Sequence, residues 1–169
     1  MATNKPRNII ITGFMSTGKS TAGVLVADEL RWPFVDTDEE VVRRTRMQIP
    51  DIFAAQGEAA FRRIESAVCQ SLVAGREQVI ATGGGTMIDP QTRSLLLADN
   101  LVVCLTATPE AIRERLGDFE GRPLAPNWET LLAERSPVYA QLPNRIDTTT
   151  LAPEEIAEEI ISLWQNASA

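Results

Sequence analysis

Residues Gly13 to Ser20 read Gly-Phe-Met-Ser-Thr-Gly-Lys-Ser and fit the pattern G-x-x-x-x-G-K-[ST], the strongest chemical signal in the chain. A β-branched run at 8–12 precedes this loop, and helix-like apolar spacing over 21–30 follows it. In that context the backbone N–H groups of the loop and the positive end of the helix surround phosphate oxygens. The lysine reaches the β- and γ-phosphates, and the last serine ligates magnesium. The loop therefore predicts binding of a nucleoside triphosphate together with Mg²⁺.

Nucleotide contacts are expected from the second half of this loop and from the residue after it. These residues are Ser16, Thr17, Gly18, Lys19, Ser20 and Thr21. Lys19 is expected to stabilise charge on a transferred phosphate, and Ser20 is the expected metal ligand. The alternative is a chance glycine turn, but the strand before the loop and the helix after it favour the phosphate site.

Two carboxylates, Asp36 and Asp38, follow a short apolar stretch at 33–35. In an open parallel sheet the carboxyl ends of the strands form the edge that faces ligands. One aspartate there can hold magnesium through its water shell while the other orients or deprotonates an acceptor hydroxyl. Taken alone, Asp-Thr-Asp is more often a turn or a helix cap.

The composition of the chain limits the classes of partner and the types of catalytic group that this protein can have. The chain has 169 residues, 44% of them hydrophobic and 23% charged, as in a single folded domain. Its net charge of -7 argues against a general electrostatic grip on nucleic acid or on an anionic membrane. Because there is no histidine, any proton acceptor must be a carboxylate. Cys69 and Cys104 lack the spacing of a zinc site or a disulfide scaffold, so both are expected to be core thiols.

The basic residues are mostly arginines: of 16, only Lys5 and Lys19 are lysines. Arginine suits two-pronged recognition of phosphate or carboxylate, although a general preference for arginine over lysine explains the bias equally well. Arg62 lies three residues before Glu65 on a predicted helix, which alone usually means a solvated ion pair.

Three further features indicate a ligand site only when they are taken together. Gly83-Gly84-Gly85 directly follows an apolar run and lets a ligand approach the main chain, although a glycine run more commonly just makes a turn. Arg122 lies in an irregular segment at 117–127 that reads either as a mobile lid or as an ordinary surface loop. Arg135 precedes Tyr139 by four residues.

The elements that must position these residues alternate along the chain. Short apolar strands are predicted at 8–12, 33–35, 79–81, 101–105 and 145–147, and helices at 21–30, 58–73, 90–97 and from 153 onward. Such alternation predicts a parallel α/β sheet in one domain, 1–169. No apolar run approaches the ~20 residues of a membrane span, and the N-terminus does not resemble a signal peptide, so a cytoplasmic protein is expected.

Together and in this order, the motifs resemble those of the shikimate kinases, small P-loop enzymes that phosphorylate the 3-hydroxyl of shikimate with ATP. The resemblance runs from about Ile9 to Ile160. Besides the loop it rests on these segments: Asp36-Thr37-Asp38, Ile52-Phe53 followed by Gly57-Glu58, Phe61-Arg62-x-x-Glu65, Gly83-Gly84-Gly85, Arg122-Pro123-Leu124 and Arg135-x-x-x-Tyr139.

The resemblance implies a fold and a set of roles. The fold would be the three-layer P-loop NTPase sandwich of the nucleoside-monophosphate-kinase type, with a five-stranded parallel sheet and a lid. Lys19, Asp38 and Arg122 would be catalytic, with Arg122 reaching the transferred phosphate and Arg115 flanking adenine. Asp36, through water, and Ser20 would serve Mg²⁺. The shikimate pocket would use Asp38, Phe53, Phe61, Arg62, Gly83, Gly84, Gly85 and Arg135, with the two arginines on the substrate carboxylate.

The chain departs from the family at the loop itself, where the family often has glycine in place of Ser16. Its backbone conformation decides whether a side chain is tolerated there. The expected partners are ATP and shikimate, and the expected state is a monomer. Two alternatives remain open: a related P-loop kinase of gluconate or of a nucleoside monophosphate, and a nucleotide-binding regulatory module without catalysis. The arginine pair and the glycine triplet favour a cyclic carboxylate as acceptor.

Overall fold

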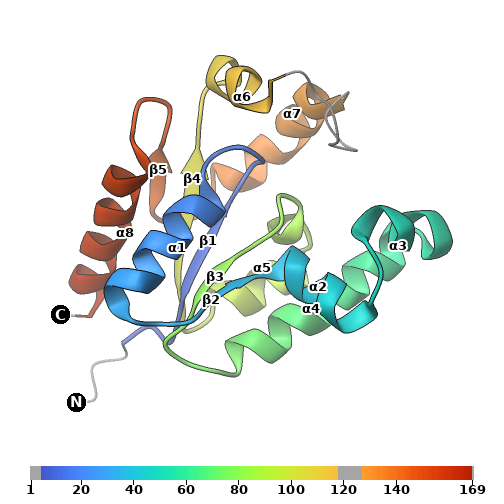
Figure 1. Ribbon diagram of the computed structural model, residues 1–169, viewed down its shortest axis with the longest axis horizontal. Helices are drawn as coiled ribbons and strands as arrows, with labels where there is room; N and C mark the ends of the chain where they lie inside the picture. Colours follow the sequence, from blue (N-terminus) through green and yellow to red (C-terminus); the bar gives the residue numbers. More distant parts are fainter. Residues whose placement is uncertain (1–4, 118–126, 169) are drawn as a thin grey trace.

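The sheet has five parallel strands in the order β2-β3-β1-β4-β5. A computed structural model describes residues 5–117 and 127–168 (Figure 1). The strands are β1 (Ile9–Gly13), β2 (Phe34–Asp36), β3 (Val79–Ala81), β4 (Leu101–Thr106) and β5 (Arg145–Asp147). All five predicted strands are therefore confirmed, with ends shifted by at most one residue.

Eight helices are present in the described part of the chain. They are α1 (Lys19–Leu30), α2 (Thr37–Thr45), α3 (Ile49–Gln56), α4 (Glu58–Val73), α5 (Pro90–Leu97), α6 (Pro109–Leu116), α7 (Trp128–Tyr139) and α8 (Pro153–Ala167), with a 3-10 turn, η1, at Thr86–Ile88. The predicted helices at 58–73 and 90–97 are confirmed in their bounds, and the first helix begins two residues before the prediction, at Lys19.

The strands bury both faces because their side chains alternate. In β1, Ile9 and Ile11 pack in one cluster with α1 and α8, whereas Ile10 packs in the other with α4, α5 and α7. Figure 1 shows α1 and α8 together on one face of the sheet. The arrangement is the predicted three-layer α/β sandwich.

Cys69 and Cys104 lie in the second cluster, where burial raises the pKa of their thiols to about 12 and about 11, so both remain inert core residues.

A third, smaller core lies apart from the sheet. It joins α2, α3 and α4 through Val41, Ile52, Phe61 and Val68, all buried. In Figure 1 these helices form an arm beside the carboxyl ends of the strands. Helices α2, α3, α6 and α7 were not predicted from the sequence, and α2, α3 and α6 are only eight or nine residues long. This arm places a wall opposite the phosphate loop.

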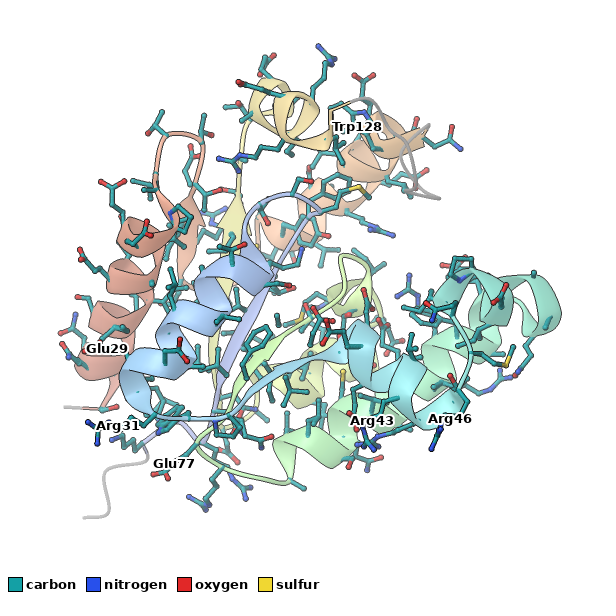
Figure 2. The ribbon with its side chains drawn as sticks, viewed as in Figure 1. Glu29, Arg31, Arg43, Arg46, Glu77 and Trp128 are labelled. Atoms are coloured by element: carbon teal, nitrogen blue, oxygen red, sulfur yellow. The ribbon has the colours of Figure 1, made fainter. Side chains whose placement is uncertain are left out.

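Not every arginine serves a site. Arg31, Arg43 and Arg46 are exposed and lie on the outside of the molecule (Figure 2). Arg31 and Arg46 end α1 and α2 in left-handed conformations, and Arg43 pairs with Glu40 on its own helix. The arginine bias therefore reflects the surface as well as the site.

No helix in the described part of the chain is long and apolar enough to cross a membrane.

Candidate active site

The phosphate-binding loop, Gly13–Ser20 (the P-loop below), connects β1 to α1. Gly13 has φ +134°, and a Cβ there would lie 2.2 Å from the Leu105 carbonyl oxygen, so only glycine fits. The Phe14 carbonyl accepts hydrogen bonds from the Thr17 hydroxyl and the Lys19 ammonium, both at 2.7 Å. Ser20 and Thr21 are exposed in the first turn of α1. The loop thus opens its N–H groups and the start of the helix toward one anion site.

Lys19 is held in a partly dehydrated position. Burial lowers the pKa of its ammonium from 10.5 to about 8, and nearby Asp38 and Asp36 offset part of that loss. A lysine ammonium that is buried and only partly compensated by nearby carboxylates is suited to bind a further anion. Phosphate oxygens would replace the Phe14 carbonyl as its partner and raise the pKa again.

Ser16 adopts the conformation that glycine favours at this point of the loop. Its φ is +59°, inside the small left-handed region that L-residues can occupy. A non-glycine residue there costs about 1–2 kcal/mol. Serine is therefore accommodated at this position, at a local conformational cost.

Asp36 ends β2 and caps α2, and it also reaches the P-loop. Its Oδ1 accepts from the backbone N–H of Asp38 at 2.9 Å and of Glu39 at 3.2 Å, and its Oδ2 accepts from the Ser20 hydroxyl at 3.1 Å. The helix cap that Asp-Thr-Asp suggested is confirmed, and the same Asp36 carboxylate also contacts the P-loop through Ser20. The Ser20 hydroxyl donates to Asp36 and keeps lone pairs for a cation. A hydroxyl and a carboxylate oxygen are the hard donors that Mg²⁺ prefers.

These two oxygens do not hold a metal alone. In the described ranges, no group of three or more Cys, Asp or Glu side chains gathers into a metal cluster. Magnesium that binds through phosphate oxygens and retains several waters needs no such cluster. The donor set therefore fits a cation that arrives with the nucleotide.

Asp38 is a carboxylate whose pKa is strongly raised in the fold. Burial raises its pKa from 3.8 to about 6, and the neighbouring carboxylates Asp36 and Glu65 add to the effect, while Lys19 and Arg62 oppose it. A Cβ on Gly83 would lie 2.8 Å from Asp38 Oδ1, so the carboxylate rests directly against the glycine triplet. A carboxylate with a pKa of about 6 is chemically suited to accept a proton.

Two guanidinium groups lie against the other glycines of the triplet. A Cβ on Gly85 would approach Arg62 Nη2 to 2.4 Å, and one on Gly84 would approach Arg135 Nη1 to 3.2 Å. The glycines have no positive φ, so their role is to leave space. From the sequence, the glycine triplet was expected to leave space for a ligand beside the main chain. In the structure, Arg62 and Arg135 occupy part of that space.

Glu65 holds Arg62 in place and is almost fully buried, contrary to the solvated ion pair that the spacing alone suggested. Its Oε1 lies 2.8 Å from Arg62 Nη1, and its Oε2 accepts from the Thr86 hydroxyl at 2.9 Å. Burial comes from the packing of α4 against η1, which no local pattern indicates. Arg62 is thereby aimed into the cavity beside Asp38.

The cavity that these groups line has a volume of about 180 Å³. Its walls are Met15, Asp38, Ile49, Phe53, Phe61, Arg62, Glu65, Gly83, Gly84, Gly85 and Arg135. Phe53 and Phe61 stack in a tilted pair with ring centroids 4.9 Å apart. The volume is below the roughly 300–1,000 Å³ of sites for drug-sized ligands, so it suits a small molecule with an anionic group. All the predicted acceptor-site residues meet here, next to the P-loop residue Met15.

Of the remaining predicted residues, Arg115 contacts the P-loop and Arg122 lies outside the described ranges. Arg115, near the end of α6, donates to the carbonyls of Ser16 at 3.1 Å and Thr148 at 2.6 Å. These bonds use the edge of an exposed guanidinium and leave its face available for stacking. Arg122 and most of the segment 117–127 lie outside the described residues, which end at Gly117 and resume at Asn127.

Sequence reasoning missed two polar side chains that hold this site together. The Tyr139 hydroxyl donates to the Gly84 carbonyl, and its burial raises the pKa of the phenol to about 12. Thr86 supports Glu65 from η1. Tyr139 was visible only as part of a motif, and Thr86 carried no signal, because both act through packing between distant segments.

The fold and the site define a P-loop kinase of a small acceptor: a phosphate loop and a pocket lined by two carboxylates and two guanidiniums lie beside each other at the carboxyl edge of a parallel sheet. Comparison with known proteins specifies the family. The shikimate kinase family model matches residues 15–165. The chain belongs to the shikimate kinase family.

Similar proteins cover almost the whole chain. A shikimate kinase of Thermodesulfovibrio yellowstonii is 39% identical over 96% of this chain and 97% of its own length, and one of Thermus thermophilus is 41% identical over 95% and 92%. The shikimate kinase from Acinetobacter baumannii, solved in complex with shikimate, has a TM-score of 0.88 at 32% identity and covers 98% of this chain and 96% of that one. A gluconokinase from Sinorhizobium meliloti, at 17% identity and TM-score 0.62, shares the fold alone.

Proposed function

We propose that this protein transfers the γ-phosphate of ATP to the 3-hydroxyl of shikimate, giving shikimate 3-phosphate and ADP in the route to chorismate. The observation that carries the proposal is the pair Arg62 and Arg135 packed on the glycine triplet beside Asp38. Two guanidiniums suit a carboxylate through forked hydrogen bonds, and a nearby carboxylate suits hydroxyl groups. Shikimate presents a carboxylate and hydroxyls on one small ring.

In the proposed reaction, Asp38 accepts a hydrogen bond from the acceptor hydroxyl and turns its oxygen toward the γ-phosphate. With a pKa of about 6, Asp38 is ionised at neutral pH and can take the hydroxyl proton as the new O–P bond forms. Lys19 stabilises the charge that develops on the phosphate oxygens. Whether proton removal leads or follows bond formation matters little to the rate, because a loose transition state needs mainly positioning.

Ser20, and Asp36 through water, would hold magnesium at the β- and γ-phosphates. The cation supplies charge neutralisation on the phosphates when it is bound. Ser20 and Asp36 are already joined by a hydrogen bond, so the metal side of the P-loop is organised before nucleotide arrives. Asp36 also caps α2, which carries Asp38, and this links the metal side of the site to the acceptor side.

The other roles are proposed by position. Ser16, Thr17, Gly18 and Thr21 would bind the nucleotide with Lys19 and Ser20, and Arg115 would stack on adenine. Arg122 would reach the transferred phosphate from the segment 117–127. Phe53 and Phe61 would wall the shikimate ring. We further propose a cytoplasmic monomer that acts on ATP and shikimate without nucleic acid or membrane partners.

The test is ADP release in a coupled assay, with shikimate, gluconate or a nucleoside monophosphate as acceptor. Shikimate is expected to accelerate ADP release and the other acceptors to leave it at the background level. Acceleration by gluconate or by a nucleoside monophosphate instead would replace the proposed substrate. ATP binding without acceleration by any acceptor would favour the regulatory module.

Arg62 gives a paired mutational test on one helix. Arg62→Ala removes a charge-assisted pair worth about 1.5–3 kcal/mol and should raise the KM for shikimate about 10- to 100-fold. Its neighbour Arg63 is exposed, so Arg63→Ala is the matched control and should leave the KM unchanged. Arg62→Lys keeps a cation beside buried Glu65 but loses the forked geometry, so an intermediate KM is expected. An unchanged KM in Arg62→Ala would remove this residue from the acceptor pocket.

A further inference from the structure

Thr148 is a fully buried polar residue that touches the P-loop from the far end of the chain. It follows β5 and is 0% exposed. Its hydroxyl lies 2.9 Å from the Thr17 carbonyl and 3.1 Å from the Thr106 carbonyl. The Thr106 carbonyl already accepts from the Thr148 backbone N–H at 2.7 Å. The single hydroxyl proton therefore serves the Thr17 carbonyl best.

Arg115 also contacts this segment of the P-loop, and the hydrogen bonds that Thr148 and Arg115 make there are called the brace below. Its Nη1 donates to the Ser16 carbonyl at 3.1 Å and to the Thr148 hydroxyl oxygen at 3.2 Å, while its Nη2 donates to the Thr148 carbonyl at 2.6 Å. Two successive P-loop carbonyls, those of Ser16 and Thr17, are thus held from outside by one hydroxyl and one guanidinium.

Because of peptide geometry, the hydrogen bonds of this brace also orient the backbone N–H groups that would bind phosphate. In a trans peptide the C=O and the N–H point in opposite directions, and none of the described peptide bonds is cis. Fixing the Ser16 carbonyl outward aims the Thr17 N–H inward, and fixing the Thr17 carbonyl does the same for the Gly18 N–H. Ser16, at φ +59°, has little intrinsic preference for this orientation, so an external hold is useful there.

We infer that Thr148 is a positioning residue for phosphate: with Arg115 it orients the Thr17 and Gly18 N–H groups toward the nucleotide before the nucleotide binds. The inference goes beyond the proposed function and rests on it only in that the P-loop binds ATP. Preorganised N–H donors gain affinity because binding no longer has to order them. Loss of the hydroxyl should therefore weaken phosphate binding without affecting the acceptor pocket.

The test compares Thr148→Val with Thr148→Ser by isothermal titration calorimetry, with ADP and with inorganic tripolyphosphate as probes. Thr148→Val removes the hydrogen bond to the Thr17 carbonyl together with the one that the hydroxyl accepts from Arg115, and it should weaken both probes about three- to tenfold. Thr148→Ser keeps the hydroxyl and should bind as the wild type does. Thr106→Val is the matched control, because its hydroxyl faces the Ile146 carbonyl and not the P-loop; its affinities should stay at the wild-type values. In Thr148→Val the KM for shikimate should remain unchanged while the KM for ATP rises.

Several results would overturn the inference. Binding of both probes by Thr148→Val within twofold of the wild type would show that the hydroxyl does not orient the loop. Equal weakening in Thr148→Ser, which keeps the hydroxyl, would show that the loss of affinity does not follow the hydroxyl, and weakening for ADP alone would assign it to the adenosine side. If the valine variant does not fold, Thr148→Ala against Thr148→Ser gives the same comparison, since both lack the methyl group. A wild-type protein that binds neither probe would overturn the proposed nucleotide site and this inference together.

Discussion

Replacing Asp38 with asparagine should stabilise the free protein while it destroys turnover. Burial and two nearby carboxylates raise the pKa of Asp38 from 3.8 to about 6, so the ionised form is disfavoured in the fold. Each pKa unit is worth about 1.4 kcal/mol, and ionised Asp38 therefore costs the folded protein about 3 kcal/mol above pH 6. Asparagine has nearly the same shape and carries no charge, so it should recover most of this free energy.

The sign of the effect depends on pH. A group whose pKa is raised on folding favours the fold while it is protonated, and this advantage is lost as pH rises from about 4 through about 6. The asparagine variant should therefore match the wild type in stability near pH 3.5 and exceed it at pH 8. For a domain of this size, about 3 kcal/mol corresponds to a rise in Tm of roughly 5–10 °C.

The assay is thermal unfolding of the free protein followed by circular dichroism at half-unit steps from pH 3.5 to pH 8. Asp28→Asn, at an exposed position on α1, is the control and should leave the Tm unchanged at every pH. Turnover of Asp38→Asn should fall at least about 100-fold, the lower range for losing a proton acceptor. A Tm at pH 8 no higher than that of the wild type, or a difference that does not change with pH, would refute the argument that the fold strains this carboxylate.

Two further predictions concern the acceptor pocket and the P-loop. Gly85→Ala places a methyl group 2.4 Å from Arg62 Nη2, so the guanidinium must move. The KM for shikimate should then rise at least tenfold, with little change in the KM for ATP. Steady-state kinetics with each substrate varied measure both constants, and wild-type values for both would contradict the prediction. The affinity for ADP should fall as pH rises above about 8, because burial lowers the pKa of Lys19 to about 8 and the free protein loses that proton. Calorimetric titrations that show no decline between pH 8 and pH 10 would contradict this shift.

Local signals in the sequence were sufficient for the five strands, for four of the eight helices in the described part of the chain and for the residues of the motifs. The apolar runs at 79–81 and 101–105 are continuous because parallel strands are buried on both faces, and their short length separates them from helices. The G-x-x-x-x-G-K-[ST] pattern carries its own geometry, since Gly13 and Gly18 are required by φ values of +134° and +100°. Helices α2 and α3 were missed because their burial depends on the arm they build with α4 and not on a long periodic pattern.

The sequence by itself determined the nucleotide loop, the alternation of strands and helices, and the family, because each depends on residue types at fixed spacing. Only the tertiary structure decided which side chains share one environment. Glu65 became a buried support for Arg62, Asp38 acquired a raised pKa, and Thr148 came to hold a loop 131 residues away along the chain. Desolvation and charge interactions act through space, so they follow from how the elements pack at the carboxyl edge of the sheet and not from the spacing of residues along the chain.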